Sequence, residues 1–222
     1  GLFSTADDTN NDGVINSSDG YDVQQFGNLH PGDIRYADLS GPNGVPDGVI
    51  DVNDETSIGD PTYPAITYGI NTALEYKGFD LALFFQGAAM SSIDMQTFLT
   101  VPFFNNGSNF SYEYFDNRWT PNSQNAKYPR ATTAPSSNNS VDSDFWMQDT
   151  SYLRLKTLIL GYTIPNEIAN RLGLDSVRLN MTANNLFTIS GLDFVDPELG
   201  YYERETAYPV QKTVSFGVNI NL

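Results

Sequence analysis

The last eleven residues of the chain alternate between apolar and polar side chains. In residues 212–222, every second side chain from Val214 onward is apolar, and small or polar residues lie between them. A hydrophobic period of two predicts a β-strand with one apolar and one polar face. The apolar face carries Val214, Phe216, Val218, Ile220 and Leu222, and the polar face carries Ser215, Gly217, Asn219 and Asn221.

Two further alternating segments, residues 65–76 and 79–87, lie close together in the sequence. Only a Lys-Gly dipeptide (77–78) separates them, which predicts a β-hairpin with a two-residue turn. The residues that flank such a turn pair directly and share a face of the sheet. Because Tyr76 and Phe79 flank this turn, we expect the apolar side chains of both strands on the same face.

Two more strands and a short helix are predicted in the second half of the chain. Residues 151–163 and 177–186 alternate, and in the first segment Arg154 and Lys156 lie opposite Leu153, Leu155 and Ile159. The second half of that segment is apolar on both faces, so its pattern does not show which face is the polar one there. Residues 163–175 have the pattern of a short amphipathic helix, with Pro165 near its start and Gly173 just past its end. The predicted fold class is therefore all-β, with about five antiparallel strands.

Long polar stretches and short connections alternate between these strands. The long stretches are residues 1–63, 90–148 and 188–210. Transmembrane β-barrels have long loops on the extracellular side and short turns on the periplasmic side, so the alternation agrees with a barrel. A soluble β-sandwich also has alternating strands, and the pattern alone favours neither architecture.

Composition narrows the function classes. Acidic residues outnumber basic ones 27 to 11, and the formal net charge of −16 argues against a nucleic-acid partner. No run of 18 apolar residues is present, which excludes a transmembrane helix, whereas a transmembrane barrel gives a far weaker signal per strand. With one histidine, no cysteine and no nucleophile elbow, the sequence does not predict an enzyme. No secretory signal is visible at Gly1, as expected for a mature chain or an internal fragment.

Residues 8–19 have the spacing of a calcium-binding loop. Calcium prefers six or more oxygen ligands, and a twelve-residue loop supplies them around a sharp glycine turn. Gly13 occupies the turn position and Ile15 the anchoring position. The ligand positions are filled by Asp8, Asn10, Asp12, the Val14 carbonyl, Asn16 and Asp19. The loop resembles half of a dockerin module; the alternative is an Asx-Gly turn that binds nothing.

A second loop of this kind is interrupted. Residues 41–46 separate the first ligand positions from the rest of the template, so that Asp38 and Ser40 would have to complete the site across an insertion, or Asn43 would substitute. Across residues 38–54 the expected calcium ligands are Asp38, Asp47, the Val49 carbonyl, Asp51 and Asp54. A plain acidic turn explains this segment equally well.

The long loop at residues 90–148 is rich in aromatic residues, which include Trp119 and Trp146. Such side chains could stack on sugar rings, but aromatic residues of long loops more often pack the loop against itself. Both tryptophans lie within the sequence strings that carry the family resemblance given below, and that resemblance implies a structural role for them. His30 lies beside a proline and is expected to be a surface turn residue rather than a ligand.

Beyond this periodicity, a series of sequence strings occurs in one order along residues 31–222. The strings are PGDIRYADL (31–39), DGVIDVND (47–54), IGDPTYPAITYGINTALEYKGFDLALFFQG (58–87), RWTP (118–121), YPR (128–130), SDFWMQDTSYLRLKTLILGYTIP (143–165), ANNLFT (183–188), DPE (196–198) and YPVQKTVSFGVNI (208–220). In this order they resemble the C-terminal part of SusC-like TonB-dependent outer-membrane transporters. The resemblance favours the barrel over the sandwich.

The resemblance implies the last strands of a transmembrane β-barrel of about 22 strands with a plugged lumen. Residues 64–222 would supply the strands, with apolar side chains toward lipid and polar side chains toward the lumen. Residues 1–63 and the loops 90–148 and 188–210 would be extracellular, and the C-terminus would be periplasmic. The family usually ends in an aromatic residue, whereas this chain ends in Leu222.

The family further implies a bacterial outer-membrane location, a SusD-like surface lipoprotein as a lid, and energy from TonB through an N-terminal part that this chain lacks. Its substrates are oligosaccharides and sometimes peptides. The alternative from a different class is a soluble, secreted, calcium-stabilised β-module, such as an adhesion or dockerin-like binding domain.

Overall fold

The structure is a computed structural model of the chain, and it divides into two compact units. It describes residues 1–97, 99–103, 109–133, 136–200 and 207–222. The first unit contains residues 1–59 and 94–147, and the second contains residues 60–93 and 148–222. Most of the predicted long loop at residues 90–148 therefore belongs with the N-terminal stretch.

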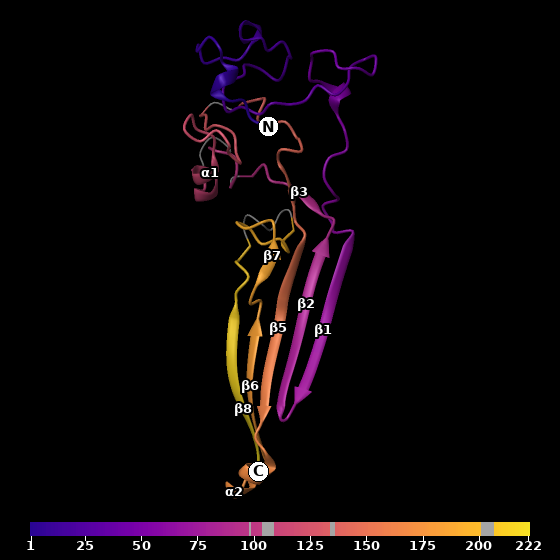
Figure 1. Cartoon of the computed structure of the whole chain (residues 1–222), viewed down its shortest axis with the longest axis vertical. Coiled ribbons are helices and arrows are strands. Elements are labelled where there is room, and N and C mark those ends of the chain that lie inside the picture. The colour runs from indigo at the N-terminus through magenta and orange to yellow at the C-terminus, as the bar shows by residue number, and fades with distance from the viewer. Residues whose placement is uncertain (98, 104–108, 134–135, 201–206) are drawn as a thin grey trace. The chain divides into compact units, whose positions relative to one another are not determined.

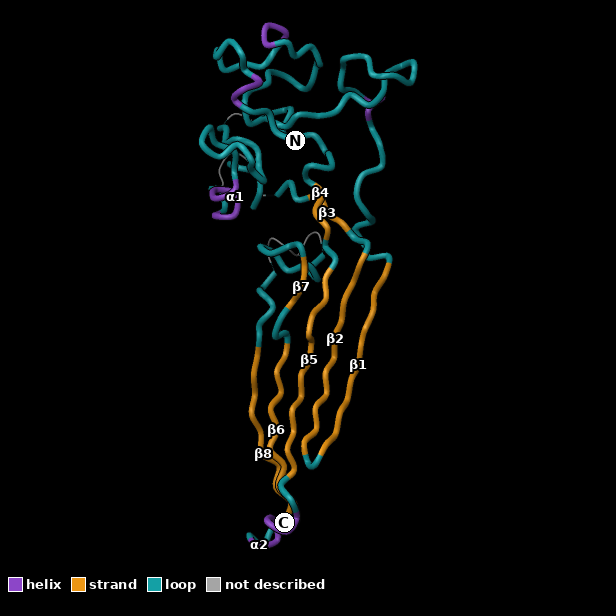
Figure 2. The backbone as a smooth tube through the Cα atoms, viewed as in Figure 1, coloured by secondary structure: helices purple, strands orange, loops and turns teal. Residues whose placement is uncertain are grey.

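The second unit is built on one antiparallel sheet, whose long strands lie side by side (Figures 1 and 2). Its spatial order is β1-β2-β5-β6-β8, and the short strand β7 pairs with β5. The strands are β1 (Ile66–Tyr76), β2 (Phe79–Ala89), β5 (Tyr152–Thr163), β6 (Ser176–Asn184), β7 (Thr188–Ser190) and β8 (Thr213–Asn221). A separate two-stranded sheet is formed by β3 (Ser92–Asp94) and β4 (Met147–Asp149). The five long strands confirm the all-β prediction.

The predicted hairpin is confirmed in its register. Tyr76 pairs with Phe79, and the pairing continues to Ile66 and Ala89. Lys77 and Gly78 have φ angles of 46° and 85°. Positive φ at both central residues is typical of a type I′ turn, whose twist matches that of the flanking strands.

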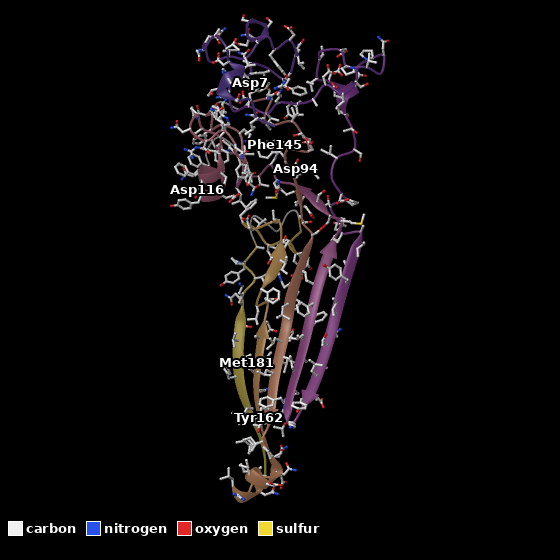
Figure 3. All side chains as sticks on the ribbon, in the orientation of Figure 1. Asp7, Asp94, Asp116, Phe145, Tyr162 and Met181 are labelled. Atoms are coloured by element: carbon white, nitrogen blue, oxygen red, sulfur yellow. The ribbon has the colours of Figure 1, made fainter. Side chains whose placement is uncertain are left out.

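The register also assigns the part of β5 that its sequence left open. Leu160 lies between Leu81 and Met181, and Tyr162 lies between Phe79 and Leu179. Figure 3 labels Tyr162 on β5 and Met181 on the neighbouring β6. Directly paired residues share a face, so this half of β5 follows the same alternation as its neighbours.

The sheet therefore has one apolar and one polar face. The apolar face carries Tyr68, Ile70, Leu74, Phe79, Leu81, Leu83, Phe85, Val177, Leu179, Met181, Val214, Phe216, Val218 and Ile220. The polar face carries Asn71, Glu75, Asp80, Gln86, Arg154, Lys156, Arg178, Asn180, Asn184, Asn219 and Asn221. Within the described strands, β1 and β8 each pair with one neighbour only, so the sheet is open at both edges.

A β-bulge interrupts the pairing of β2 with β5. Phe84 pairs with Thr157, whereas Phe85 pairs with Leu155, so Lys156 is the extra residue. A bulge changes the direction in which a side chain points. The extra residue reverses the alternation that follows it: Leu155 pairs with Phe85 on the apolar face, whereas Ile159 pairs with Ala82 on the polar face. The predicted position of Ile159 on the same face as Leu155 is therefore wrong.

The predicted helix is shorter than its pattern. Helix α2 spans Asn166–Arg171, and Gly173 follows it with a φ angle of 73°. The flanking residues are held by strand pairing instead, because the Ile164 N–H donates to Val177 and the Asp175 N–H donates to Asn221. Among the described residues, no helix is long and apolar enough to cross a membrane.

The first unit consists mainly of loops around two small cores. One core contains Ile34, Tyr114, Tyr128 and Trp146, and the other contains Phe3, Ile15 and Leu29. The unit's helical elements are α1 (Tyr112–Asn117) and the 3-10 turns Thr5–Asp7, Ser17–Asp19 and Val52–Asp54. Trp119 and Trp146 are both buried, which confirms their predicted structural role.

Candidate functional site

The apolar face of the sheet is uncovered. Phe216 is 80% exposed, Leu74 is 60% exposed and Val218 is 58% exposed. A β-sandwich would bury such side chains against a second sheet. Within the described part of the chain, the strands of this sheet pack edge to edge, and no second layer covers the face. An apolar surface of this extent marks an interaction with a partner or with lipid.

An ion pair crosses the polar face near the hairpin turn. Asp80 on β2 and Arg178 on β6 meet with 2.6 Å between Oδ2 and Nη2. Gly161 lies between them on β5, where an added Cβ would come within 2.2 Å of the Asp80 Oδ1 atom. Because the middle strand carries a glycine, the two outer strands can join side chains across it.

A second polar cluster joins β5 to the segment after β7. Arg154 donates to Asp196 at 2.7 Å and to Glu198 at 2.6 Å, and Lys156 donates to Glu198 at 2.6 Å. The Arg154 side chain is only 3% exposed. The sequence prediction missed this cluster because the partners are 42 and 44 residues apart. The DPE string and two cations on one strand were the available signals.

The loop at residues 8–19 is closed by hydrogen bonds from main-chain N–H groups to its carboxylates. Asp8 accepts from the N–H groups of Asp12 and Gly13, at 3.1 and 2.9 Å. Asp19 accepts from Thr9 and Asn10, at 2.8 and 3.2 Å. The first and last carboxylates therefore hold the two ends of the loop together.

The remaining predicted side-chain ligands of this loop also accept hydrogen bonds from main-chain N–H groups. The Val14 N–H donates to Asp12 at 2.8 Å, and the Ser18 N–H donates to Asn16 at 2.8 Å. Asn10 accepts from the Asp12 N–H at 2.9 Å. Every side chain of the predicted ligand set thus has an oxygen directed toward the loop's own backbone.

The interrupted loop has the same hydrogen-bond scheme. Asp38 accepts from the Gly48 N–H at 2.6 Å, in the way that Asp8 accepts from Gly13. Asp54 accepts from Leu39 and Ser40, at 2.7 and 3.0 Å. The insertion therefore leaves the closure of the loop unchanged.

The other ligand positions of the second loop also match. The Val49 N–H donates to Asp47 at 3.1 Å, and the Asn53 N–H donates to Asp51 at 2.7 Å. The N–H groups of Asp51 and Ser40 hold the pKa of Asp54 below its usual value. This carboxylate is therefore kept in its charged form.

The two loops offer hard oxygen atoms, although the side chains are not gathered around one point. Among the described residues, no group of three or more histidine, cysteine, aspartate or glutamate side chains has the geometry of a metal site. Asp38 nonetheless has a buried Oδ1 atom with no hydrogen-bond partner. A buried carboxylate oxygen without a donor is costly unless a cation or water reaches it. The oxygen donors of this second loop are of the type that calcium prefers.

No protein-family model matches the chain. Its relatives include TonB-dependent receptor P3 of Formosa agariphila, which is 32% identical over 206 residues, or 87% of this chain. TonB-dependent receptor P26 of the same organism is 27% identical over 85% of the chain. The chain belongs to the TonB-dependent receptor family. It spans 19% of the length of each of these receptors.

Solved structures share the fold of this chain. The RagAB peptide importer in its closed-closed state matches 81% of the chain with a TM-score of 0.58 at 22% identity. The open-open state matches 96% of the chain with a TM-score of 0.58 at 21% identity. The chain covers 20% and 24% of those chains. At this identity the match concerns the fold alone: the open sheet is part of a β-barrel of the TonB-dependent receptor type.

Proposed function

We propose that the chain forms part of the wall and several surface loops of an outer-membrane nutrient importer that is energised through TonB. The observation that carries this proposal is the strand register, which gathers apolar side chains on one face and polar side chains on the other. A barrel wall needs such a sheet, because lipid contacts one side and the lumen the other. The role is transport, without catalysis by this chain.

The proposed orientation follows from connection lengths. The turn at residues 77–78 and helix α2 are short connections at one end of the sheet and would be periplasmic, together with the C-terminus. The stretches 1–63, 90–148 and 188–210 would then be extracellular. Proteolysis of intact cells tests this orientation. A protease cleavage site inserted in loop 90–148 should be cut by protease added outside the cells, and the same site inserted at the 77–78 turn should be protected.

The proposed partners are TonB, reached through a part of the receptor outside this chain, and a SusD-like surface lipoprotein that acts as a lid. The proposed cargo is an oligosaccharide or a peptide; the match to a peptide importer supports the second class as much as the family resemblance supports the first. Uptake of labelled oligosaccharides and peptides should be compared in wild-type cells and in strains that lack the receptor or TonB. Deletion of the receptor and deletion of TonB should each abolish uptake of the same class of compound, either oligosaccharides or peptides. Unchanged uptake of both oligosaccharides and peptides in these strains would contradict the proposal.

We also propose that residues 8–19 bind calcium, and that residues 38–54 form a second site. The shared hydrogen-bond scheme of the two loops and the unpartnered Asp38 oxygen support this proposal. The ligands of the first site would be Asp8, Asn10, Asp12, the Val14 carbonyl, Asn16 and Asp19, and those of the second Asp38, Asp47, the Val49 carbonyl, Asp51 and Asp54.

Calcium removal gives a direct test in the purified receptor. Binding of an ion stabilises the state that holds it by mass action, so a chelator should make residues 1–59 sensitive to protease before the barrel melts. Asp8→Asn should lower the bound calcium, and Asp22→Asn, outside both loops, should not. No calcium in elemental analysis, with protease sensitivity unchanged by chelator, would contradict the proposal.

A further inference from the structure

The segment that follows β7 is folded back onto the polar face of the sheet. We call this segment, residues 191–200, the strap. Its Glu198 contacts Gln86 on β2 and Lys156 on β5, and both side chains belong to the polar face. Leu192, at the start of the strap, is only 4% exposed. The strap therefore covers two strands instead of extending away from the end of the sheet.

The strap is held by a compact set of charges. Arg154 reaches both carboxylates at once, and its Nε atom also donates to Thr188 at 2.8 Å. Lys156 contacts both oxygens of Glu198 at 2.6 Å. Charge-assisted hydrogen bonds of this kind are strong, and the planar guanidinium of arginine holds its donors in a fixed geometry, whereas the ammonium of lysine acts as a point charge on a flexible stem.

Local structure prepares both sides of this contact. On β5, Arg154 and Lys156 are two residues apart, as side chains of one strand face are, and both contact Glu198. On the strap, the Asp196 Oδ1 atom accepts from the Glu198 N–H at 2.9 Å, and the Leu199 N–H donates to the Asp196 carbonyl at 3.3 Å. This turn fixes the two carboxylates next to each other before they meet the cations, which lowers the entropy lost when the contact forms.

We propose that the strap is a fixed, in-folded element that lines and narrows the mouth of the conduit, and that Arg154 is the positioning residue that holds it there. This inference rests on the barrel function proposed above, which makes the polar face the lumen side. Within the cluster, the two cations Arg154 and Lys156 balance the charges of the two carboxylates Asp196 and Glu198. Loss of Arg154 would both release the strap and leave two carboxylates unpaired in the conduit.

The test uses thiol labelling of the full-length receptor in its outer membrane. A single cysteine at Leu192→Cys reports whether the strap is held down, because the Leu192 side chain is buried. Adding Arg154→Met should raise the rate of labelling by a membrane-impermeant maleimide about tenfold or more. Arg154→Lys keeps the charge but loses the fixed guanidinium geometry and should give an intermediate rate. The matched control Arg178→Met removes another ion-paired arginine of the same face and should leave the rate unchanged.

Labelling is measured only on receptor that migrates as a folded barrel in an unheated gel. Gel mobility therefore tests the barrel proposal, and the labelling rate tests the strap. Glu198→Gln in the Leu192→Cys background gives a second route to the same release if Arg154→Met lowers the amount of folded receptor. Faster labelling in either variant, with Arg178→Met unchanged, supports the strap. Equal labelling rates in all folded variants, or equal acceleration by Arg178→Met, would overturn it.

Discussion

The two compact units place their apolar side chains in opposite ways. In the loop unit, Phe3 and Tyr114 are completely buried, as in a protein surrounded by water. In the sheet unit, Leu74 and Phe216 are 60% and 80% exposed on a continuous apolar face. Hydrophobic residues avoid water in both cases if the sheet meets lipid and the loops meet water. The difference indicates that the loop unit is suited to water and the apolar face of the sheet unit to lipid.

Polar side chains show the same contrast. In the loop unit they are used as internal links: Asp33 is fully buried and pairs with Arg130 at 2.8 Å, and it also accepts from Asn139. Asn138 is fully buried as well, and its amide donates to the Ile34 carbonyl. In the sheet unit, the polar side chains line one face. A loop unit held by such internal contacts is an ordered structure, and its stability can be measured apart from that of the sheet.

The largest effect is expected from opening the core of the loop unit. Trp146→Ala removes a side chain that is 3% exposed and donates to the Asn139 carbonyl at 3.1 Å. Truncation of a buried tryptophan costs about 3–5 kcal/mol, so the loops should become sensitive to protease while the barrel keeps its folded gel mobility. Tyr112→Ala, at a side chain that is 87% exposed, is the control and should change neither readout. Loss of the folded barrel in Trp146→Ala would mean that the two units do not differ as described.

A charge on the apolar face should act on the sheet instead. Leu81 belongs to the apolar face, and its neighbour Ala82 belongs to the polar face, where it pairs with Ala73 and Ile159. An arginine costs roughly 2–4 kcal/mol at the lipid-facing middle of a barrel and much less toward the lumen. Leu81→Arg should therefore lower the amount of folded receptor in outer membranes far more than Ala82→Arg. Equal losses would remove the distinction between the faces.

A smaller effect is expected on the polar face at Gly161. An added Cβ there would meet Asp80 and Arg178, whose atoms lie 2.2 and 2.5 Å from its position. Overpacking of this kind costs typically about 1–3 kcal/mol, so Gly161→Ala should lower the melting temperature of the receptor. Gly191→Ala is the matched control, because nothing lies within 4 Å of its added Cβ. Equal melting temperatures for both variants would mean that the Asp80–Arg178 bridge does not cross over β5.

The smallest effect is expected from acid on the loops. Main-chain N–H groups lower the pKa of Asp54 from its usual value of 3.8. A carboxylate with a lowered pKa in the folded state stabilises that state above pH 3.8, and this contribution is lost as the pH falls through the lowered pKa. The protection of the Leu39 and Ser40 amides from hydrogen exchange, relative to their intrinsic rates at each pH, should therefore fall as the pH drops through the lowered pKa of Asp54. Asp54→Asn should remove this pH dependence, and an unchanged dependence would assign it to another group.

The sequence predicted the parts of the fold that depend on local pattern and turn chemistry. The Tyr76–Phe79 pairing follows from two alternating segments and a Lys-Gly turn that tolerates positive φ. The predicted orientation of Ile159, on the face of Leu153 and Leu155, was wrong, because the bulge at Lys156 reverses the alternation of β5. The direct pairing of Ile159 with Ala82 and Thr182 decides the face, and such pairing depends on strands distant in sequence.

The candidate sites differ in the same way: one kind depends on local sequence pattern and the other on contacts between residues distant in sequence. The first calcium-type loop was predicted because twelve successive residues carry the whole template, and the second because it keeps a first and a last carboxylate, Asp38 and Asp54, across its insertion. Calcium binding by either loop stays a prediction. The strap was not predicted, because Arg154 and Glu198 are 44 residues apart and meet only where the segment after β7 folds back onto the sheet. A sequence pattern shows neither a bulge nor the direction in which a loop folds back.

The central claim is that the two faces of the sheet meet different surroundings, and a spin-label scan along β6 tests it most directly. Cysteines placed one at a time from Ser176 to Asn184 in the full-length receptor would carry nitroxide labels in a lipid bilayer. Collision rates with oxygen, which concentrates in lipid, should peak at residues 177, 179, 181 and 183, and those with a polar nickel reagent should peak at the residues between them. Rates without a period of two, or with the opposite phase, would contradict the barrel wall described here.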